Sequence, residues 1–333
     1  MIAHTTPLAH SLDRRGLLAG LAFAAASFGA LSFARPARAA GEFRIGYQKG
    51  SSSLLVLKSR GLVEETLSPL GFTVTWTEFT SGPPLLEALN AGSLDFGATG
   101  APPPIFAQAA GADLVYALAT KASPLTNAIL VPKDSPITGA EGLKGQQVAV
   151  AKGSSAHALL IKALEQAGLT WDDVEPVYLQ PADAKAAFEG GSVGVWSIWD
   201  PYYAATELAI DARAIATGET VGVSNRSFYL AARSFATDHA DALAAVEAAL
   251  TQSDAWAGDH PDEVAEMISE QTGMDAAVTR HVEGRRVYGL EPLTAEIIAE
   301  QQDLADVFLG LGLIPERIDI AAAVIAPAEP ANA

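Results

Sequence analysis

One short pattern occurs twice in this sequence: a strand-like apolar run, then a Lys-Gly-Ser-Ser loop, then a helical pattern. The loop spans 49–52 in the first copy and 152–155 in the second. This order predicts a buried strand, a tight turn and a helix. The first turn of a helix leaves backbone N–H groups without acceptors, and the helix dipole favours negative charge there. We therefore expect each half of the chain to present one helix N-terminus to a shared anion.

A second pair of segments supports an internal duplication. Residues 89–102 align without a gap on residues 188–201. Both copies predict a helix end, a Gly-Ser turn, a strand and then a proline that opens another helix. The alternative is that any chain of alternating strands and helices reuses Gly-Ser turns. A true duplication predicts two similar halves with one site between them.

Strands and helices alternate through both halves, which predicts an α/β fold with two mostly parallel sheets flanked by helices. Residues 127–132 and 228–232 are extended segments that would carry the chain into the second half and back. They predict a hinge of two strands. In such sheets ligands bind beyond the carboxyl ends of the strands, and the Gly-, Ser- and Pro-rich loops lie at those ends.

The expected division of the chain follows from this pattern. The parts are a signal peptide (1–39), the first part of lobe 1 (40–131), lobe 2 (132–226), the return of lobe 1 with the C-terminal helices (227–326), and a disordered tail (327–333).

The first residues are expected to form an export signal. Arg14 and Arg15 precede an apolar stretch, and the segment 37–39 fits a cleavage site. Twin arginines indicate the route that exports folded proteins, with Sec export as the alternative. The chain has no cysteine, so no disulfide can form and no lipid anchor can be attached at the cleavage point. These features predict a periplasmic protein that diffuses freely after cleavage near Ala39.

Composition and motifs argue against several functions. The net charge of −18 disfavours nucleic acid and anionic membranes as partners. No nucleotide-loop motif, zinc-protease motif or cysteine nucleophile occurs, and we expect no catalytic residue, metal ligand or cofactor. His157 is expected to be a packing residue. Lys49 and Lys152 could neutralise an anion, although N–H groups and hydroxyls are the stronger candidates.

The turn before Pro201 contains further candidate ligand-binding residues. Trp196 and Trp199 have opposite parity in the expected strand, so they point to opposite faces. Trp199 lies at the end of the strand and is the better cleft residue. Asp200 precedes Pro201 and is expected to cap the next helix, or else to contact the ligand or the hinge directly.

Five segments of the chain match a known family. They are 44–50, 87–90, 105–116, 198–203 and 227–233. Together they closely resemble the periplasmic aliphatic-sulfonate-binding proteins of ABC importers. The resemblance implies the two-lobed type II periplasmic binding protein fold. It also implies a monomer that captures alkanesulfonates as a sulfur source and delivers them to an ABC permease with a cytoplasmic ATPase.

The residues expected to bind the ligand lie mainly in loops that follow strands. They are Gln48, Gly82, Thr99, Gly100, Ser154, Ser155, Trp199, Asp200 and Tyr229. The hydroxyls and N–H groups of the 152–155 loop are expected to hold the sulfonate oxygens. A taurine, sulfate-ester or nitrate ligand and a ligand-sensing subunit are alternatives, and an enzyme on the same scaffold is not expected.

One departure from the family bears on the ligand. Relatives often carry an acidic residue where this chain has Ala101. In the pseudo-repeat Ala101 corresponds to Asp200, so we expect it to face the ligand across the cleft. A neutral wall there would favour alkyl or bulky sulfonates over taurine, which carries an ammonium group.

Overall fold

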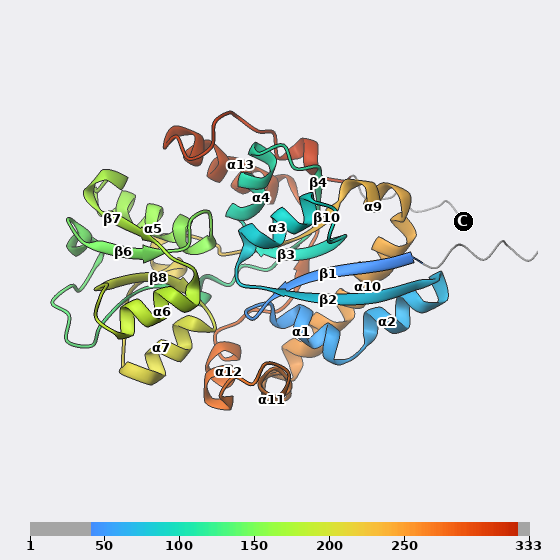
Figure 1. Ribbon diagram of the computed structural model, residues 1–333, viewed down its shortest axis with the longest axis horizontal. Coiled ribbons are helices and arrows are strands. Elements are labelled where there is room, and N and C mark those ends of the chain that lie inside the picture. Colours follow the sequence, from blue (N-terminus) through green and yellow to red (C-terminus); the bar gives the residue numbers. More distant parts are fainter. Residues whose placement is uncertain (1–40, 326–333) are drawn as a thin grey trace, which may run out of the picture. The chain divides into compact units, whose positions relative to one another are not determined.

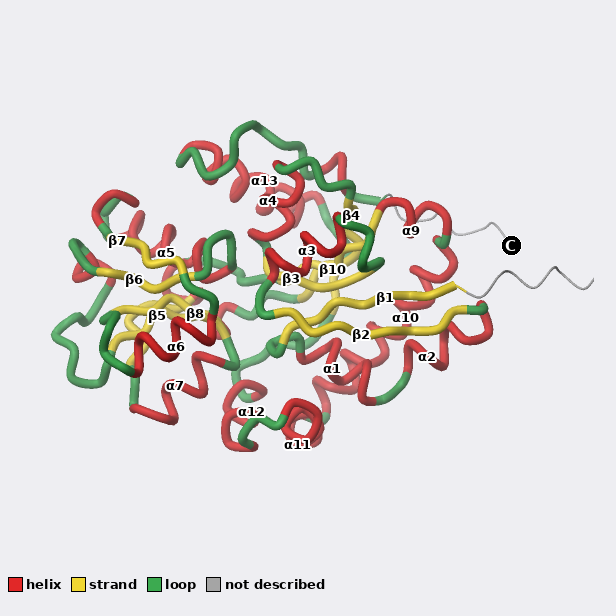
Figure 2. Tube along the Cα trace, in the orientation of Figure 1, coloured by secondary structure: helices red, strands yellow, loops and turns green. Residues whose placement is uncertain are grey.

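The structure of the protein is a computed structural model that describes residues 41–325. The signal peptide expected at 1–39 and the tail expected at 327–333 lie outside the described residues. Two β-sheets form the described part, and each has helices on both faces (Figures 1 and 2). Within residues 41–325, no helix has the length and apolar character needed to cross a bilayer. The predicted α/β fold class is confirmed.

The first sheet has six strands. Their spatial order is β11 (Leu290–Glu291), β4 (Leu114–Thr120), β10 (Ser227–Ala232), β3 (Phe96–Gly100), β1 (Gly41–Gln48) and β2 (Phe72–Phe79). Strand β1 is parallel to β2 and β3, whereas β10 is antiparallel to β3 and β4.

The second sheet has five strands. Their order is β7 (Glu175–Tyr178), β6 (Gln147–Val150), β8 (Val195–Trp199), β5 (Asn127–Val131) and β9 (Arg213–Thr217). Strand β6 is parallel to β7 and β8, whereas β5 is antiparallel to β8 and β9.

The strand by which the chain enters each sheet from the other runs against its neighbours. Asn127, which begins β5, pairs with Trp199 at the carboxyl end of β8. Ser227, which begins β10, pairs with Gly100 at the carboxyl end of β3. Each crossing strand therefore starts where its neighbours end and runs away from that edge. Since β5 belongs to the second sheet, the chain changes sheet before Asn127, earlier than the predicted boundary after residue 131.

The helices occupy the stretches between strands and most of the C-terminal part. They are α1 (Ser52–Ser59), α2 (Leu62–Leu67), α3 (Gly82–Asn90), α4 (Pro102–Ala109), α5 (Ser155–Gln166), α6 (Pro181–Glu189), α7 (Tyr202–Ile210), α8 (Gly218–Val221), α9 (Arg233–Asp238), α10 (Ala240–Asp259), α11 (Pro261–Thr272), α12 (Ala276–Glu283) and α13 (Ala295–Gly310). The helical stretch that follows the first loop is divided into α1 and α2, because Gly61 adopts a left-handed φ of 64° between them.

Each sheet buries apolar side chains on both faces. Helices α1, α2 and α10 cover one face of the six-stranded sheet, and α3, α4 and α13 cover the other (Figure 1). Helix α5 packs on one face of the five-stranded sheet, and α6 and α7 lie on the other. Trp196 is fully buried in that last core, as its parity predicted. The layers fix the strand ends, and the candidate site lies at those ends.

Candidate functional site

Loops from the edges of both sheets surround a cavity of about 100 Å³. A cavity needs roughly 10–15 Å³ for one water, so this space fits a small polar group. All nine residues predicted to bind a ligand line it, and they are Gln48, Gly82, Thr99, Gly100, Ser154, Ser155, Trp199, Asp200 and Tyr229. The topology brings them together because both sheets turn their parallel-strand carboxyl ends towards this space.

Helix α5 begins at the cavity, and Ser154 is its N-cap. The Ser154 hydroxyl accepts a hydrogen bond from His157 N–H at 3.3 Å and donates to the Ala151 carbonyl at 2.6 Å. Its proton is therefore already engaged, which differs from the expected donor role. Among residues 41–325 the Ser155 hydroxyl has no such partner, and first-turn N–H groups have no acceptor inside a helix. The Ser155 hydroxyl and the N–H groups of Ser155 and Ala156 are therefore the donors of this loop, because the His157 N–H is already bonded to Ser154.

His157 supports the loop from behind. Its ring is fully buried, packs on Trp171 at 4.7 Å between centroids, and accepts the Gly153 N–H on Nδ1 at 3.2 Å. Burial lowers the pKa of His157 to about 4, and the Lys152 charge adds to this effect. The histidine does not line the cavity, so the expectation of a packing residue agrees with its position.

The two serines provide a matched pair of variants. Ser154→Ala should lower the free energy of unfolding by about 1 kcal/mol, because an N-cap is lost. Ser155→Ala should leave stability within about 0.5 kcal/mol and weaken binding of ethanesulfonate by about 1–1.5 kcal/mol. Urea unfolding and isothermal calorimetry on both variants measure the two effects. If Ser155→Ala changed stability but not affinity, the assignment of roles would be reversed.

The first loop copy is held by the C-terminal part of the chain. The Ser52 hydroxyl donates to Glu283 Oε1 at 2.7 Å, and the Ser53 hydroxyl donates to Asp254 Oδ1. A Cβ added at Gly50 would lie 2.5 Å from the Asp200 carbonyl oxygen. Glycine is therefore required where this loop meets the loop after β8. The duplicated loops face one cavity, and in the first of them the Ser51 hydroxyl accepts the Gln48 N–H at 3.3 Å.

Arg286 supplies the positive charge of the cavity. Its Nη2 donates to the Gly50 carbonyl at 2.9 Å, and its Nε lies 3.7 Å from Glu283 Oε1. Within residues 41–325, Arg286 Nε and Asn127 Nδ2 are buried donors without a hydrogen-bond acceptor, and both residues line the cavity. Orphaned buried donors are costly. They favour a ligand that offers several acceptor oxygens.

The lysines considered from the sequence lie elsewhere. Lys49 Nζ is 4.0 Å from Glu78, and Lys152 Nζ lies 5.6 Å from the centre of the Tyr178 ring. Neither residue lines the cavity. The arginine at 286 takes the place that the sequence analysis gave to the lysines.

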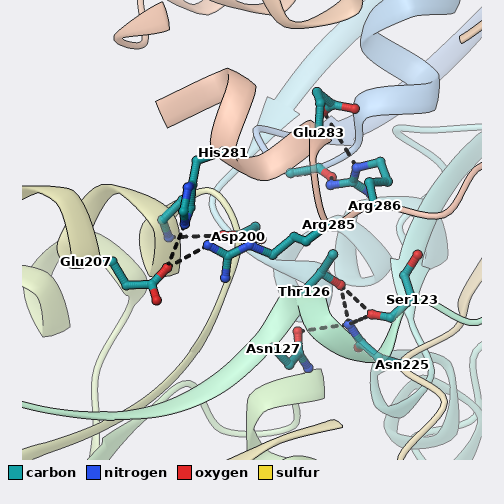
Figure 3. A network of polar contacts seen from close by, with 12 residues as sticks. Ser123, Thr126, Asn127, Asp200, Glu207, Asn225, His281, Glu283, Arg285 and Arg286 are labelled. Carbon is teal, nitrogen blue, oxygen red and sulfur yellow. Dashed lines mark hydrogen bonds and ion pairs between the residues drawn. The ribbon is translucent and has the colours of Figure 1, made fainter. Parts of the chain in front are cut away.

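Asp200 links the cavity to an ionic network (Figure 3). Its Oδ1 accepts the Ala204 N–H at 3.0 Å in the first turn of α7, so Asp200 caps the helix, although Pro201 and not Asp200 occupies the N-cap position. Its Oδ2 lies 3.5 Å from Arg285 Nε, and Arg285 Nη2 lies 2.6 Å from Glu207. Burial raises the pKa of Asp200 to about 6, although the Arg285 charge opposes this shift. The network joins α7, beside the second sheet, to the segment after α12.

Asn225 ties the two crossing segments together. Its Nδ2 donates to Thr126 Oγ1 at 2.7 Å, to Asn127 Oδ1 at 3.0 Å and to the Ser123 carbonyl at 3.3 Å (Figure 3). Its φ of 49° lies in the left-handed region that asparagine tolerates better than most residues. Asn225 therefore fixes the geometry of the hinge from within the cavity wall.

The remaining predicted residues shape the wall. Gln48 Nε2 donates to the Ala98 carbonyl at 3.1 Å, and the Thr99 hydroxyl donates to the Gly100 carbonyl at 3.0 Å. Gly82 allows close packing, because a Cβ there would lie 2.5 Å from Pro103 Cγ. Tyr229 is buried. It lines the cavity from the crossing strand β10.

Ala101 does not lie where the sequence predicted it. Ala101 does not line the cavity that contains Asp200, and its carbonyl accepts a hydrogen bond from Gln301 at 2.6 Å. It instead lines a second cavity. Ala101 and Asp200 correspond in the sequence alignment, but they line different cavities.

Sequence reasoning missed Arg286, Asn225 and Asp254, which also line the cavity. The paired arginines 285–286 are visible in the sequence, but local patterns do not show which part of the fold they contact. Arg286 meets Gly50 across 236 positions of the chain, so only the tertiary fold brings them together.

Two sheets joined by two crossing segments, with a donor-rich cavity at their facing edges, define a hinged solute-binding protein. The chain belongs to the NMT1/THI5-like family, whose model matches residues 71–264. Within it, the chain belongs to the aliphatic sulfonate-binding proteins. It is 43% identical over 278 residues to an Escherichia coli K12 protein with that name, covering 83% of this chain and 86% of the relative.

Solved structures agree. The alkanesulfonate-binding protein SsuA from Xanthomonas axonopodis pv. citri, bound to MOPS, superposes with a TM-score of 0.82 at 40% identity, covering 86% of this chain and 99% of that chain. The periplasmic aliphatic sulphonate binding protein SsuA from Escherichia coli superposes with a TM-score of 0.79 at 41% identity. The match covers 88% of this chain and 94% of that chain.

Proposed function

We propose that this protein captures aliphatic sulfonates in the cavity between its sheets and delivers them to an ABC permease for sulfur acquisition. The observation that carries the proposal is the donor set of the cavity. It combines the α5 N-terminus, the Ser155 hydroxyl, Asn127 Nδ2 and Arg286. A sulfonate offers three acceptor oxygens and a charge that does not depend on pH near neutrality, which matches donors that have no acceptor of their own.

Both oxygens of Asp254 and one oxygen of Asp200 are hydrogen-bonded, and Asp200 Oδ2, which has no hydrogen bond among residues 41–325, lies 3.5 Å from the Arg285 cation. Asp254 accepts bonds from the Ser53 hydroxyl and the Gly289 N–H. Asp200 accepts the Ala204 N–H and lies near Arg285. Charge-assisted hydrogen bonds contribute about 1.5–3 kcal/mol each, so a few suffice for micromolar affinity after ordering costs.

Capture would act through closure of the hinge. Gln180 accepts hydrogen bonds from Ser81 at 3.1 Å and from Thr80 at 3.3 Å, so loops beside the two sheets touch at the cleft. Arg285 and Glu207 form a second bridge. A ligand with bonds to donors of both sheets would favour this closed state, and the permease would then recognise closure.

A ligand panel tests the function. Calorimetry with ethanesulfonate, taurine, sulfate, a sulfate ester and nitrate should give the highest affinity for ethanesulfonate. Preference for nitrate or sulfate would identify another oxyanion importer. Release of sulfite from any ligand would identify an enzyme. Growth on alkanesulfonate as the sulfur source after gene deletion separates an importer subunit from a sensor.

We also infer export to the periplasm from the leader sequence, and a freely diffusing monomer from the resemblance to periplasmic binding proteins. The twin-arginine assignment predicts that replacing Arg14 and Arg15 with lysine blocks appearance of the mature protein in the periplasm. Fractionation and immunoblotting measure this, with the unaltered leader as the control. Normal secretion of the variant would indicate Sec export.

A further inference from the structure

A second cavity, of about 260 Å³, adjoins the first. The two cavities share Ser155, at the start of α5, and Asn225, in the crossing segment. The second cavity lies between one face of α5 and one face of α13, and its inner wall includes Ala158, Phe228 and Leu304. Ala158 and Phe228 are buried, so this wall is apolar at its base.

We propose that the second cavity receives the hydrocarbon tail of an organosulfonate whose head group occupies the first cavity. This inference rests on the proposed function. Ser155, Ala158 and Lys162 occupy one face of α5 at helical spacing, and all three line the second cavity. They span roughly 10 Å at 1.5 Å per residue. A head group held at the α5 N-terminus would therefore lie at the start of this apolar path.

The charges around the second cavity disfavour a second anionic group on the ligand. Arg226 is paired with Glu291 and lies 3.4 Å from Glu300, and Lys162 lies 2.8 Å from Glu165. Arg226 Nε is a buried donor without a hydrogen bond among the described residues, but Glu291 and Glu300 balance the charge of Arg226, and Asp303 adds another carboxylate to the wall. A second anionic group would meet these carboxylates, whereas an alkyl or aryl tail gains from the apolar wall. Ala101 also lines this cavity, and its side chain is compatible with an apolar tail because it carries no charge.

Chain length provides the first test. Calorimetry with methane-, butane- and octanesulfonate should show affinity rising by up to about fourfold for each methylene that becomes buried. If the protein binds methanesulfonate but affinity does not rise with chain length, this inference fails and the proposed function stands. If no sulfonate of any length binds, both fail.

A cavity-filling variant provides the second test. Leu304→Trp should reduce octanesulfonate affinity at least tenfold and leave methanesulfonate affinity within twofold. Leu311→Trp, at the exposed end of α13, is the matched control and should alter neither ligand. Equal losses for both ligands in Leu304→Trp, or an unchanged octanesulfonate affinity in a folded variant, would overturn the tail assignment. Thermal unfolding confirms that both variants are folded.

Discussion

Replacing Arg286 with glutamine is expected to lower the affinity for ethanesulfonate about 100-fold, or by about 3 kcal/mol. Arg286 is the cation that lines the head-group cavity, and its Nε is a buried donor without an acceptor within residues 41–325. Glutamine retains a donor for the Gly50 carbonyl, so the loop contact can persist. Calorimetry measures the affinity, and urea unfolding reports the stability cost of leaving Glu283 without its cation.

Arg317→Gln is the matched control for that experiment. It removes the same charge from an exposed site, where screening weakens long-range effects, and it should leave affinity within a factor of two. A folded Arg286→Gln variant that binds ethanesulfonate within threefold of the wild type would contradict the assigned role. Arg286→Lys should recover only part of the affinity, because lysine provides a point charge without the planar donor set.

The second large effect concerns the pH dependence of stability through Asp200. Its pKa in the folded protein is about 6 and its ordinary value is 3.8. Because the folded pKa is raised, the stabilising contribution is complete only below the ordinary pKa of 3.8 and is lost as pH rises through 6. The full shift corresponds to about 3 kcal/mol at 1.36 kcal/mol per pKa unit, of which about 2.4 kcal/mol is lost between pH 4 and pH 7.

Asp200→Asn isolates that contribution. Asparagine cannot ionise, and its oxygen can still accept the Ala204 N–H. Relative to this variant, the wild type should lose about 2.4 kcal/mol of unfolding free energy between pH 4 and pH 7. Urea unfolding of both proteins at several pH values gives the difference. A constant difference would mean that Arg285 keeps the carboxylate ionised throughout.

Local sequence patterns predicted those parts of the site that local structure determines. A strand, a glycine turn and a helix follow each other within a few residues, so the loops at 49–52 and 152–155 could be placed at strand ends. Which serine hydroxyl is free could not be predicted, because Ser154 and Ser155 are equivalent until the helix start is known. Only Ser154 occupies the N-cap.

Contacts between distant segments could not be predicted from local sequence patterns. Hydrophobic periodicity identifies a strand but not its direction, so β5 and β10 were predicted as extended crossing segments, whereas their antiparallel direction was not. The position of Arg286 depends on the segment after α12 returning to Gly50. Asn225 likewise acquires its role only when both crossing segments lie side by side.

The two crossings have a consequence for the order of folding. The five-stranded sheet is continuous in sequence, from Asn127 to Thr217, so all its strands are available early in synthesis. The six-stranded sheet instead needs β10, which separates β3 from β4, and α1 needs Asp254 and Glu283 as partners for its serines. Contacts of such long sequence separation form slowly. We therefore expect strands β1–β4 to form an incomplete sheet with unpaired edges until β10 has been synthesised. Unpaired strand edges promote aggregation, so this half of the nascent chain is expected to need the most protection.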